Sequence, residues 1–309
     1  MRDPYDPIYA CIIEVYGCDG SYWYISGPEV ANMDAGVSLN PKLSGAIDAP
    51  VKTLWVPGAF GETPVGKRWQ RRDVVFAVQT FAPDPETWMT VDFEWRAAWD
   101  YEKRSRIVYT TSAGSRWLEV SLLEEPTAYE GETDAGKSPF LVCDSTIVMT
   151  VASELPFYQS EPDIYEWELP TGGPERADVF IEISNDSDVP VFTRWTLYNP
   201  GGAVWTLPDF SWGSNEYGRA LQDAGRVVEL PALAPGENVV VDADPRRQTI
   251  ISETRTNPMA RWRGQDLLYP IAPGAKGRIP VSVRDAKAGA ALRLEIPKWY
   301  TRPWSRPLP

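Results

Sequence analysis

Residues 179–199 read VFIEISNDSDVPVFTRWTLYN, and this stretch decides the fold. In its first part Val179, Ile181 and Ile183 alternate with outward-facing positions such as Glu182, which is the period of two expected of a half-buried β-strand. The polar segment NDSDVP interrupts this strand pattern, and the second part, VFTRWTLYN, repeats it. Short strands separated by regular turn signals are typical of a β-sandwich.

The strand pattern continues outward from this stretch in both directions. Toward the C-terminus it recurs in RVVELPAL, ENVVVDAD, RIPVSV and LRLEI, between the turn signals NPGG, LAPGE and APGAKG. Toward the N-terminus it appears in IYACIIEVYG and SYWYIS around the turn CDGS, then in DVVFAVQTF, in the hairpin RIVYTTSAGSRWLEV and in STIVMTVAS. The sequence therefore predicts a mainly β protein.

One segment, TVDFEWRAAWDYEKR, predicts a helix. Thr90 is the expected N-cap, and Lys103 and Arg104 are expected in the last turn, where basic residues suit the helix dipole. Trp95 and Trp99 fall on one face of this helix, so we expect that face to cover a sheet.

Charge divides the chain into two parts. Residues 1–170 contain 13 Lys and Arg against 27 Asp and Glu, a net charge of −14, whereas residues 171–309 contain 17 against 16, a net charge of +1. The change falls at ELPTGGP, a Pro- and Gly-rich joint. The sequence therefore predicts two domains, 1–170 and 171–309, and the strand pattern predicts a β-sandwich for the second.

The composition excludes several classes of function. The chain of 309 residues has no histidine, which removes Ser-His-Asp and Cys-His catalysis and histidine zinc sites. No apolar run approaches the roughly 20 residues of a membrane span, and the N-terminus does not read as a signal peptide, so we expect a soluble, unsecreted protein. Three cysteines suit free thiols in a reducing cytoplasm, with a Cys11–Cys18 disulfide left open as the alternative.

An enzyme of this composition would have to use carboxylates. The candidate clusters are Glu124 with Glu125, Asp186 with Asp188, and Asp242 with Asp244. Paired carboxylates serve glycosidases, but adjacent acids in turns more often accept backbone N–H groups. Neither a calcium loop nor a Gly-rich phosphate loop has the required spacing. We therefore expect no catalytic residue, no metal and no cofactor.

Aromatic residues are abundant, with 14 Trp and 14 Tyr. Trp205, Phe210, Trp212 and Tyr217 cluster in AVWTLPDFSWGSNEYG, where they could contact a partner, pack in the core or stack on sugars. The basic run KRWQRR at 67–72 is short and lies in the acidic half, so it is expected to be a solvated strand edge or an ion-pairing seam rather than a nucleic-acid site.

These segments together resemble a known family, the distal tail (minor tail) proteins of long-tailed phages that infect actinobacteria. The resemblance covers nearly the whole chain in order and approximate spacing. It rests on GAIDAPVKTLWVPGAFG, KRWQRRDVVFAVQTF, FEWRAAWDYE, LLEEP, STIVMTVASELPFYQSEP, VFIEISNDSDVPVFTRWTLYNPGGAVWTLPDFSW, DLLYPIAPGAKGRIPVSV and WYTRPWSRP.

The resemblance implies a structural virion protein at the tail tip, assembled in the host cytoplasm and without membrane insertion. It implies two β-sandwich domains: a tail-tube-like first domain, 1–170, that forms a homo-oligomeric, hexameric ring, and a galectin-like second domain, 171–309, with a C-terminal tail. The ring would join the tail tube protein to the tip hub, and DNA would pass through it without specific binding. The family transfers no catalytic or binding residue to this chain. The alternative is a carbohydrate-binding β-sandwich module that acts at a bacterial surface.

The acidic first half suggests how the inner wall of such a ring would interact with DNA. A negative inner wall repels phosphates and keeps the genome from sticking during passage. The candidates for this wall are three acids in the loop YEGETDAGK, Glu130, Glu132 and Asp134, whose simpler interpretation is a solvated turn.

Overall fold

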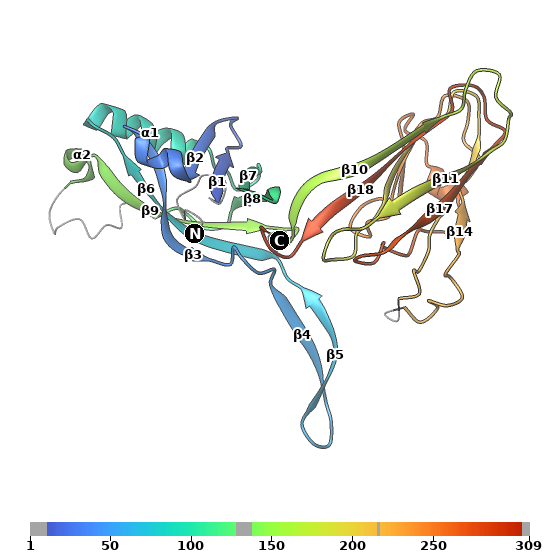
Figure 1. The fold of residues 1–309 in the computed structure, drawn as a ribbon, viewed down its shortest axis with the longest axis horizontal. Coiled ribbons are helices and arrows are strands. Elements are labelled where there is room, and N and C mark those ends of the chain that lie inside the picture. Colours follow the sequence, from blue (N-terminus) through green and yellow to red (C-terminus); the bar gives the residue numbers. More distant parts are fainter. Residues whose placement is uncertain (1–10, 128–137, 215–216, 305–309) are drawn as a thin grey trace, which may run out of the picture. The chain divides into compact units, whose positions relative to one another are not determined.

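The computed structural model describes residues 11–127, 138–214 and 217–304, and the chain forms two compact units (Figure 1). The first unit comprises residues 1–159 together with 300–309, and the second comprises residues 160–299. The division differs from the predicted boundary after residue 170, because one continuous strand, β10 (Tyr158–Glu168), runs from the first unit into the second. The C-terminal tail also belongs to the first unit, not to the second.

The first unit is an antiparallel β structure. Its strands pair in the order β3-β6-β9-β8-β7-β1-β2. The bounds of these strands are β1 Ile12–Tyr16, β2 Tyr22–Ser26, β3 Gly36–Ser44, β6 Arg72–Phe81, β7 Ser105–Thr111, β8 Gly114–Leu122 and β9 Asp144–Ser153. A 3-10 helix, Pro28–Asn32, follows β2. Alternate residues of β9 are buried along its whole length, as the sequence pattern predicts.

Helix α1 (Pro85–Ala97) completes the core of the first unit. Trp95 is fully buried, and its ring lies 5.5 Å from that of Trp23 and 5.2 Å from that of Trp99. Trp99 in turn packs against Phe76 on β6, with the ring centroids 5.8 Å apart. The expectation that these two tryptophans lie on the covered face is confirmed.

The bounds of this helix differ from the prediction. The N-cap is Asp84 and not Thr90, because the Asp84 carboxylate accepts the backbone N–H groups of Glu86 and Thr87 and Pro85 suits the first helical turn. Thr90 lies inside the helix, where its hydroxyl donates to the Glu86 carbonyl. The helix ends before the expected basic residues because Asp100 accepts the next backbone N–H groups in a turn. Two short helices, α2 (Pro139–Val142) and α3 (Pro258–Arg261), were not predicted.

The second unit is a sandwich of two sheets. One has the order β16-β15-β12-β18-β10 and the other β11-β17-β13-β14. Trp167 of the first sheet and Trp205 of the second meet between them, with ring centroids 6.4 Å apart. The bounds are β11 Ala177–Ser184, β12 Arg194–Tyr198, β13 Val204–Pro208, β14 Val227–Glu229, β15 Val239–Asp242, β16 Ile250–Ser252, β17 Lys276–Arg284 and β18 Ala291–Tyr300. The prediction of a mainly β protein is confirmed.

The chain returns to the first unit at Tyr300, where arginines hold it. The Arg116 guanidinium lies over the Tyr300 ring, 3.4 Å from its centroid, and donates to the Arg302 carbonyl at 3.0 Å. Arg302 pairs with Asp48 at 2.6 Å. Arg72, which is fully buried, donates to the Thr301 carbonyl at 2.8 Å. The second unit is therefore an insertion whose two ends are both fixed to the first.

Candidate assembly surfaces

The structure does not bring the carboxylate candidates into a catalytic pair. Glu124 and Glu125 are both exposed at the end of β8. Asp242 accepts the backbone N–H of Asp244, and the Asp244 carboxylate accepts the backbone N–H and the guanidinium of Arg246. Asp242 and Asp244 therefore organise turns, as their spacing allows.

Asp186 also has a structural role, because it accepts the Ser184 hydroxyl at 3.3 Å and pairs with Lys276 at 3.5 Å. Within residues 11–127, 138–214 and 217–304, no cluster of three metal-ligating side chains occurs. In the same residues, no helix is long and apolar enough to cross a bilayer. All three cysteines are free thiols, so the structure does not form the Cys11–Cys18 bridge that the sequence left open.

The aromatic stretch 205–217 is not an exposed surface. Trp205 lies in β13 and is fully buried, so for this residue core packing is the correct interpretation. Trp212 is half-buried against Gly277, where an added Cβ would lie 3.0 Å from the Trp212 ring. Tyr217 packs on Tyr269 with ring centroids 5.1 Å apart. A more exposed aromatic surface lies elsewhere among the described residues.

That surface is a two-stranded hairpin formed by β4 (Val51–Pro57) and β5 (Glu62–Trp69), which projects from the first unit (Figure 1). All of β4 is exposed, and so is β5 except at its last residue. Trp55 is 53% exposed and Phe60, at the tip, is completely exposed. The tip is a tight turn, in which the Gly58 N–H donates to the Gly61 carbonyl and Gly61 has a φ of +76°. Apolar residues that no part of their own chain covers mark an interaction surface.

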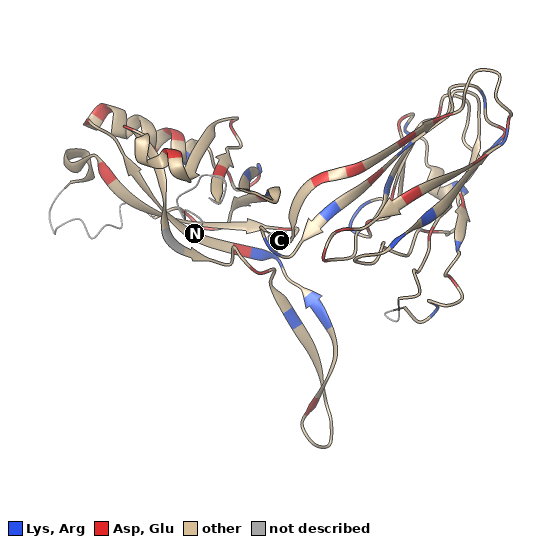
Figure 2. Ribbon diagram, viewed as in Figure 1, with Lys and Arg blue, Asp and Glu red and all other residues tan. Residues whose placement is uncertain are grey.

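The base of the hairpin is anchored and basic. Trp69 packs edge-on against Phe157, with ring centroids 5.0 Å apart, and Lys67 lies over the Trp69 ring. Lys52 and Arg68 are direct cross-strand partners, which places two like charges side by side (Figure 2). In the part of the chain that the structure describes, neither has a carboxylate within ion-pair distance. The hairpin therefore carries a positive charge that the described residues do not neutralise.

The rest of the basic run 67–72 has a different role. Arg71 pairs with Asp73 at 2.7 Å, which agrees with the expected ion-pairing seam. Arg72 is fully buried and binds backbone carbonyls, among them those of Ala46 and Pro156, each at 2.7 Å. The run therefore joins the exposed hairpin to the core of the first unit.

A second exposed surface is the solvent face of α1. Met89 and Phe93, one turn apart, are 44% and 72% exposed. Glu86 and Glu94 are exposed beside them, and neither forms an ion pair within the described residues. The neighbouring short helix α2 adds the exposed Leu141. This surface combines apolar side chains with unneutralised negative charge, the opposite charge to that of the hairpin (Figure 2).

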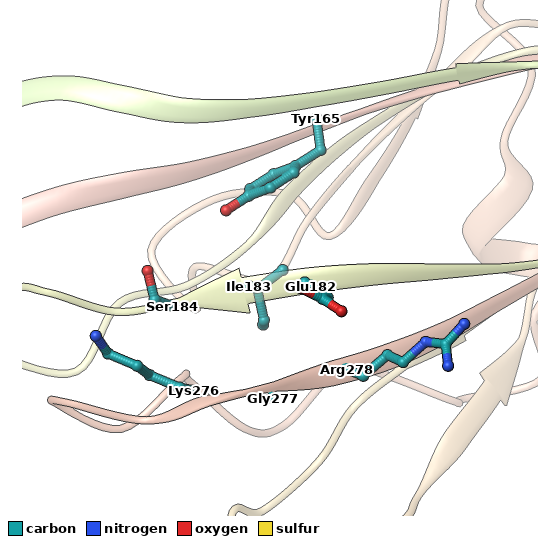
Figure 3. Close-up of a pocket in the computed structure, with 7 residues that line it drawn as sticks. All are labelled: Tyr165, Glu182, Ile183, Ser184, Lys276, Gly277 and Arg278. Carbon is teal, nitrogen blue, oxygen red and sulfur yellow. The ribbon is translucent and has the colours of Figure 1, made fainter.

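A depression of about 450 Å³ lies at one edge of the second unit (Figure 3). Its lining residues are Tyr165, Glu182, Ile183, Ser184, Lys276, Gly277 and Arg278. Tyr165 comes from β10 and extends its hydroxyl toward β11, which belongs to the facing sheet (Figure 3). Burial and the neighbouring Asp163 raise the pKa of Tyr165, so its hydroxyl stays protonated as a hydrogen-bond donor at neutral pH. The depression is open and polar, with one aromatic ring.

The hairpin was not predicted from the sequence, although the segment PVKTLWVPGAFGETPVGKRW contains turn residues between two possible strands. The dipeptide Pro57-Gly58 and a second glycine at position 61 separate two runs with β-branched and aromatic residues. Because both faces of the hairpin are exposed, the apolar and polar residues do not alternate as they do in a half-buried strand.

The proteins that this chain resembles are phage tail proteins. No family model matches the sequence. The minor tail proteins Gp27 of Mycobacterium phages D29 and L5 are each 25% identical to it, over 96% of this chain and 97% of theirs. In fold, it is similar to the SPP1 Dit (gp 19.1) protein, with a TM-score of 0.55 at 10% identity, over 94% of this chain and 99% of Dit.

A chain of the phage P2 baseplate in its activated conformation is also similar in fold, with a TM-score of 0.51 at 10% identity, over 94% of this chain and 98% of that one. Both sequence relatives are virion tail proteins, which agrees with the expected location at the phage tail and with a non-enzymatic role. The resemblance noted from the sequence is confirmed: the chain is similar over nearly its whole length to minor tail proteins of actinobacterial phages, it has a Dit-like fold, and its role in the phage tail is structural.

Proposed function

We propose that this protein forms a ring at the tail tip, through its tail-tube-like first unit, and that the ring joins the tail tube to the tip hub around the DNA channel. The observation that carries the proposal is the β4–β5 hairpin, whose strands are exposed almost throughout and whose Lys52 and Arg68 have no carboxylate partner within the described residues. An isolated two-stranded ribbon is marginal in water, so a projecting one gains stability from a binding partner. A hexamer is the copy number that the family resemblance implies.

The test is the mass and shape of the purified full-length chain. Light scattering over a range of concentrations and negative-stain images should show closed rings. A chain that stays monomeric at every concentration, alone and with the tail tube protein added, would contradict self-assembly.

We further propose that the inner wall of this ring is acidic. The support is the net charge of −14 on residues 1–170, which would repel DNA phosphates. The candidates Glu130, Glu132 and Asp134 lie outside the described residues. An assembled-ring structure with a neutral or basic inner wall would contradict this part of the proposal and leave the role in the tail unchanged.

A second candidate function, carbohydrate binding by the galectin-like second unit, is favoured by the depression at Tyr165. Aromatic rings beside several polar groups suit sugars, which present both apolar faces and hydroxyls. A glycan array probed with the full chain and with Tyr165→Ala tests this function. Binding that the substitution removes would support it, and the absence of any glycan bound by the wild-type chain would contradict it.

A further inference from the structure

The hairpin and the solvent face of α1 are two separate surfaces of the first unit. Figure 1 shows the hairpin projecting away from the body, whereas α1 lies on the other side of β6 and β9. The hairpin therefore does not cover the helix of its own chain, and both surfaces are exposed among the described residues.

The two surfaces are complementary in charge. Residues 51–69 contain Lys52, Lys67 and Arg68 against Glu62, a net charge of +2. The helix region 84–100 contains five acidic residues against one arginine, a net charge of −4. That arginine, Arg96, already pairs with Asp92 at 2.9 Å. Opposite potentials favour a contact between these surfaces.

The two surfaces also match in apolar content and length. Phe60 is completely exposed at the hairpin tip, and Met89 and Phe93 form an exposed apolar stripe on α1. The seven residues of β4 span about 23 Å, and the 13 residues of α1 span about 20 Å. One hairpin can therefore contact a helix along most of its length, with apolar groups and charges engaged together.

We propose that the β4–β5 hairpin of one copy binds the solvent face of α1 in the next copy, with Phe60 against the Met89–Phe93 stripe and the hairpin base facing acids of the helix region. The inference rests on the proposed ring and names the surfaces that build it. Because the contact joins two different surfaces of identical chains, it is heterologous, and its repetition closes a ring when the rotation from one copy to the next divides a full turn evenly. Pairing of hairpin with hairpin would instead bring the clusters of Lys52 and Arg68 from two copies together, which like-charge repulsion disfavours.

A mixing experiment with two variants of the full chain tests this contact. Phe60→Ser should disable the hairpin and Phe93→Ser the helix face, and both side chains are exposed, so the fold should be retained. Each variant alone should be a monomer, with its self-association weakened about thirtyfold or more. An equimolar mixture should form 1:1 dimers, because each pair retains one intact hairpin and one intact helix face. The matched control is Leu221→Ser, an 88% exposed residue of the second unit, which should assemble as wild type.

Charge reversal gives an independent readout. Arg68→Glu, at the base of the hairpin, and Glu86→Arg, in the first turn of α1, should each weaken assembly, and the two substitutions in one chain should restore it at least in part. A Phe93→Ser variant that assembles like wild type, or a mixture that stays monomeric, would overturn this inference while wild-type rings would leave the proposed function intact. A wild-type chain that never assembles would contradict both.

Discussion

Trp95 and Trp55 belong to the same unit and illustrate two uses of tryptophan. Trp95 is fully buried on α1 between the rings of Trp23 and Trp99, whereas Trp55 is 53% exposed on the projecting hairpin. The first residue contributes to folding, because all of its surface is removed from water within the chain. The second leaves apolar surface in water until another molecule covers it. The aromatic surplus of the sequence therefore divides between a core and an assembly surface.

The largest expected effect is the loss of stability when the buried tryptophan, Trp95, is replaced. Trp95→Ala should lower the free energy of unfolding by about 3 to 5 kcal/mol, because it leaves a cavity among packed rings. Thermal or denaturant unfolding of the purified variant measures this loss. An unfolding curve like that of wild type would show that the helix is peripheral to the core.

The second-largest expected effect is that of acid on the second unit, through the buried carboxylate of Glu237. Burial by itself raises the pKa of this group, but hydrogen bonds from the Thr256 hydroxyl, the Ala234 N–H and the Arg261 guanidinium outweigh it and lower the pKa to about 2. A carboxylate with a depressed folded-state pKa contributes stability above its unfolded pKa, and this contribution disappears as the pH falls toward 2. It amounts to about 3 kcal/mol at neutral pH.

The measurement is the unfolding free energy as a function of pH, for wild type and for Glu237→Gln. The variant should be less stable at neutral pH and should lose less stability between pH 5 and pH 2, by about the same 3 kcal/mol. Glu182→Gln, at an exposed position, is the matched control. Parallel pH profiles for wild type and Glu237→Gln would contradict the assignment.

Trp55→Ala tests the exposed side of the comparison. We expect the unfolding free energy to change by no more than about 0.5 kcal/mol, because the Trp55 side chain makes few contacts within its own chain that the substitution could remove. Self-association should weaken about tenfold or more, as measured by sedimentation or light scattering. A variant that unfolds early and yet assembles normally would reverse the roles assigned to the two tryptophans.

The smallest expected effect is that of salt on the assembled protein. Raising the ionic strength from about 0.1 M to 1 M shortens the Debye length from about 10 Å to about 3 Å and screens the attraction between the basic hairpin and the acidic helix region. Self-association should weaken severalfold, while thermal stability of the monomer should change little. Assembly that strengthens with salt would indicate a contact dominated by apolar surface.

Much of the fold could be predicted from the sequence because burial leaves a periodic pattern. Strands such as β6, β9 and β11 face a core on at least one side, so their apolar residues recur at every second position. The start of α1 was misplaced because Thr90 and Asp84 are both good caps, and only the latter is followed by a proline suited to the first turn. The break between the two units was misplaced because β10 has few fully buried residues and crosses it without a turn.

The candidate surfaces were harder to predict, because apolar residues on a fully exposed element do not recur at regular positions in the sequence. The aromatic stretch around Trp205 and the hairpin around Trp55 are similar in composition, and only the tertiary structure distinguishes the buried one from the exposed one. The acidic and basic residues that flank the two surfaces are likewise recognisable as unpaired only when the distances to all other charges are known.

The insertion of the second unit has a mechanical consequence. Any pull on residues 160–299 reaches the first unit through two covalent connections, at residue 160 and at residue 299, instead of through a single linker. The load is shared between β10 and β18, which are neighbours in one sheet, and the contacts of Arg72 and Arg116 with the returning chain resist its detachment. An insertion connected at both ends is therefore harder to peel away from one end than a domain attached by a single linker.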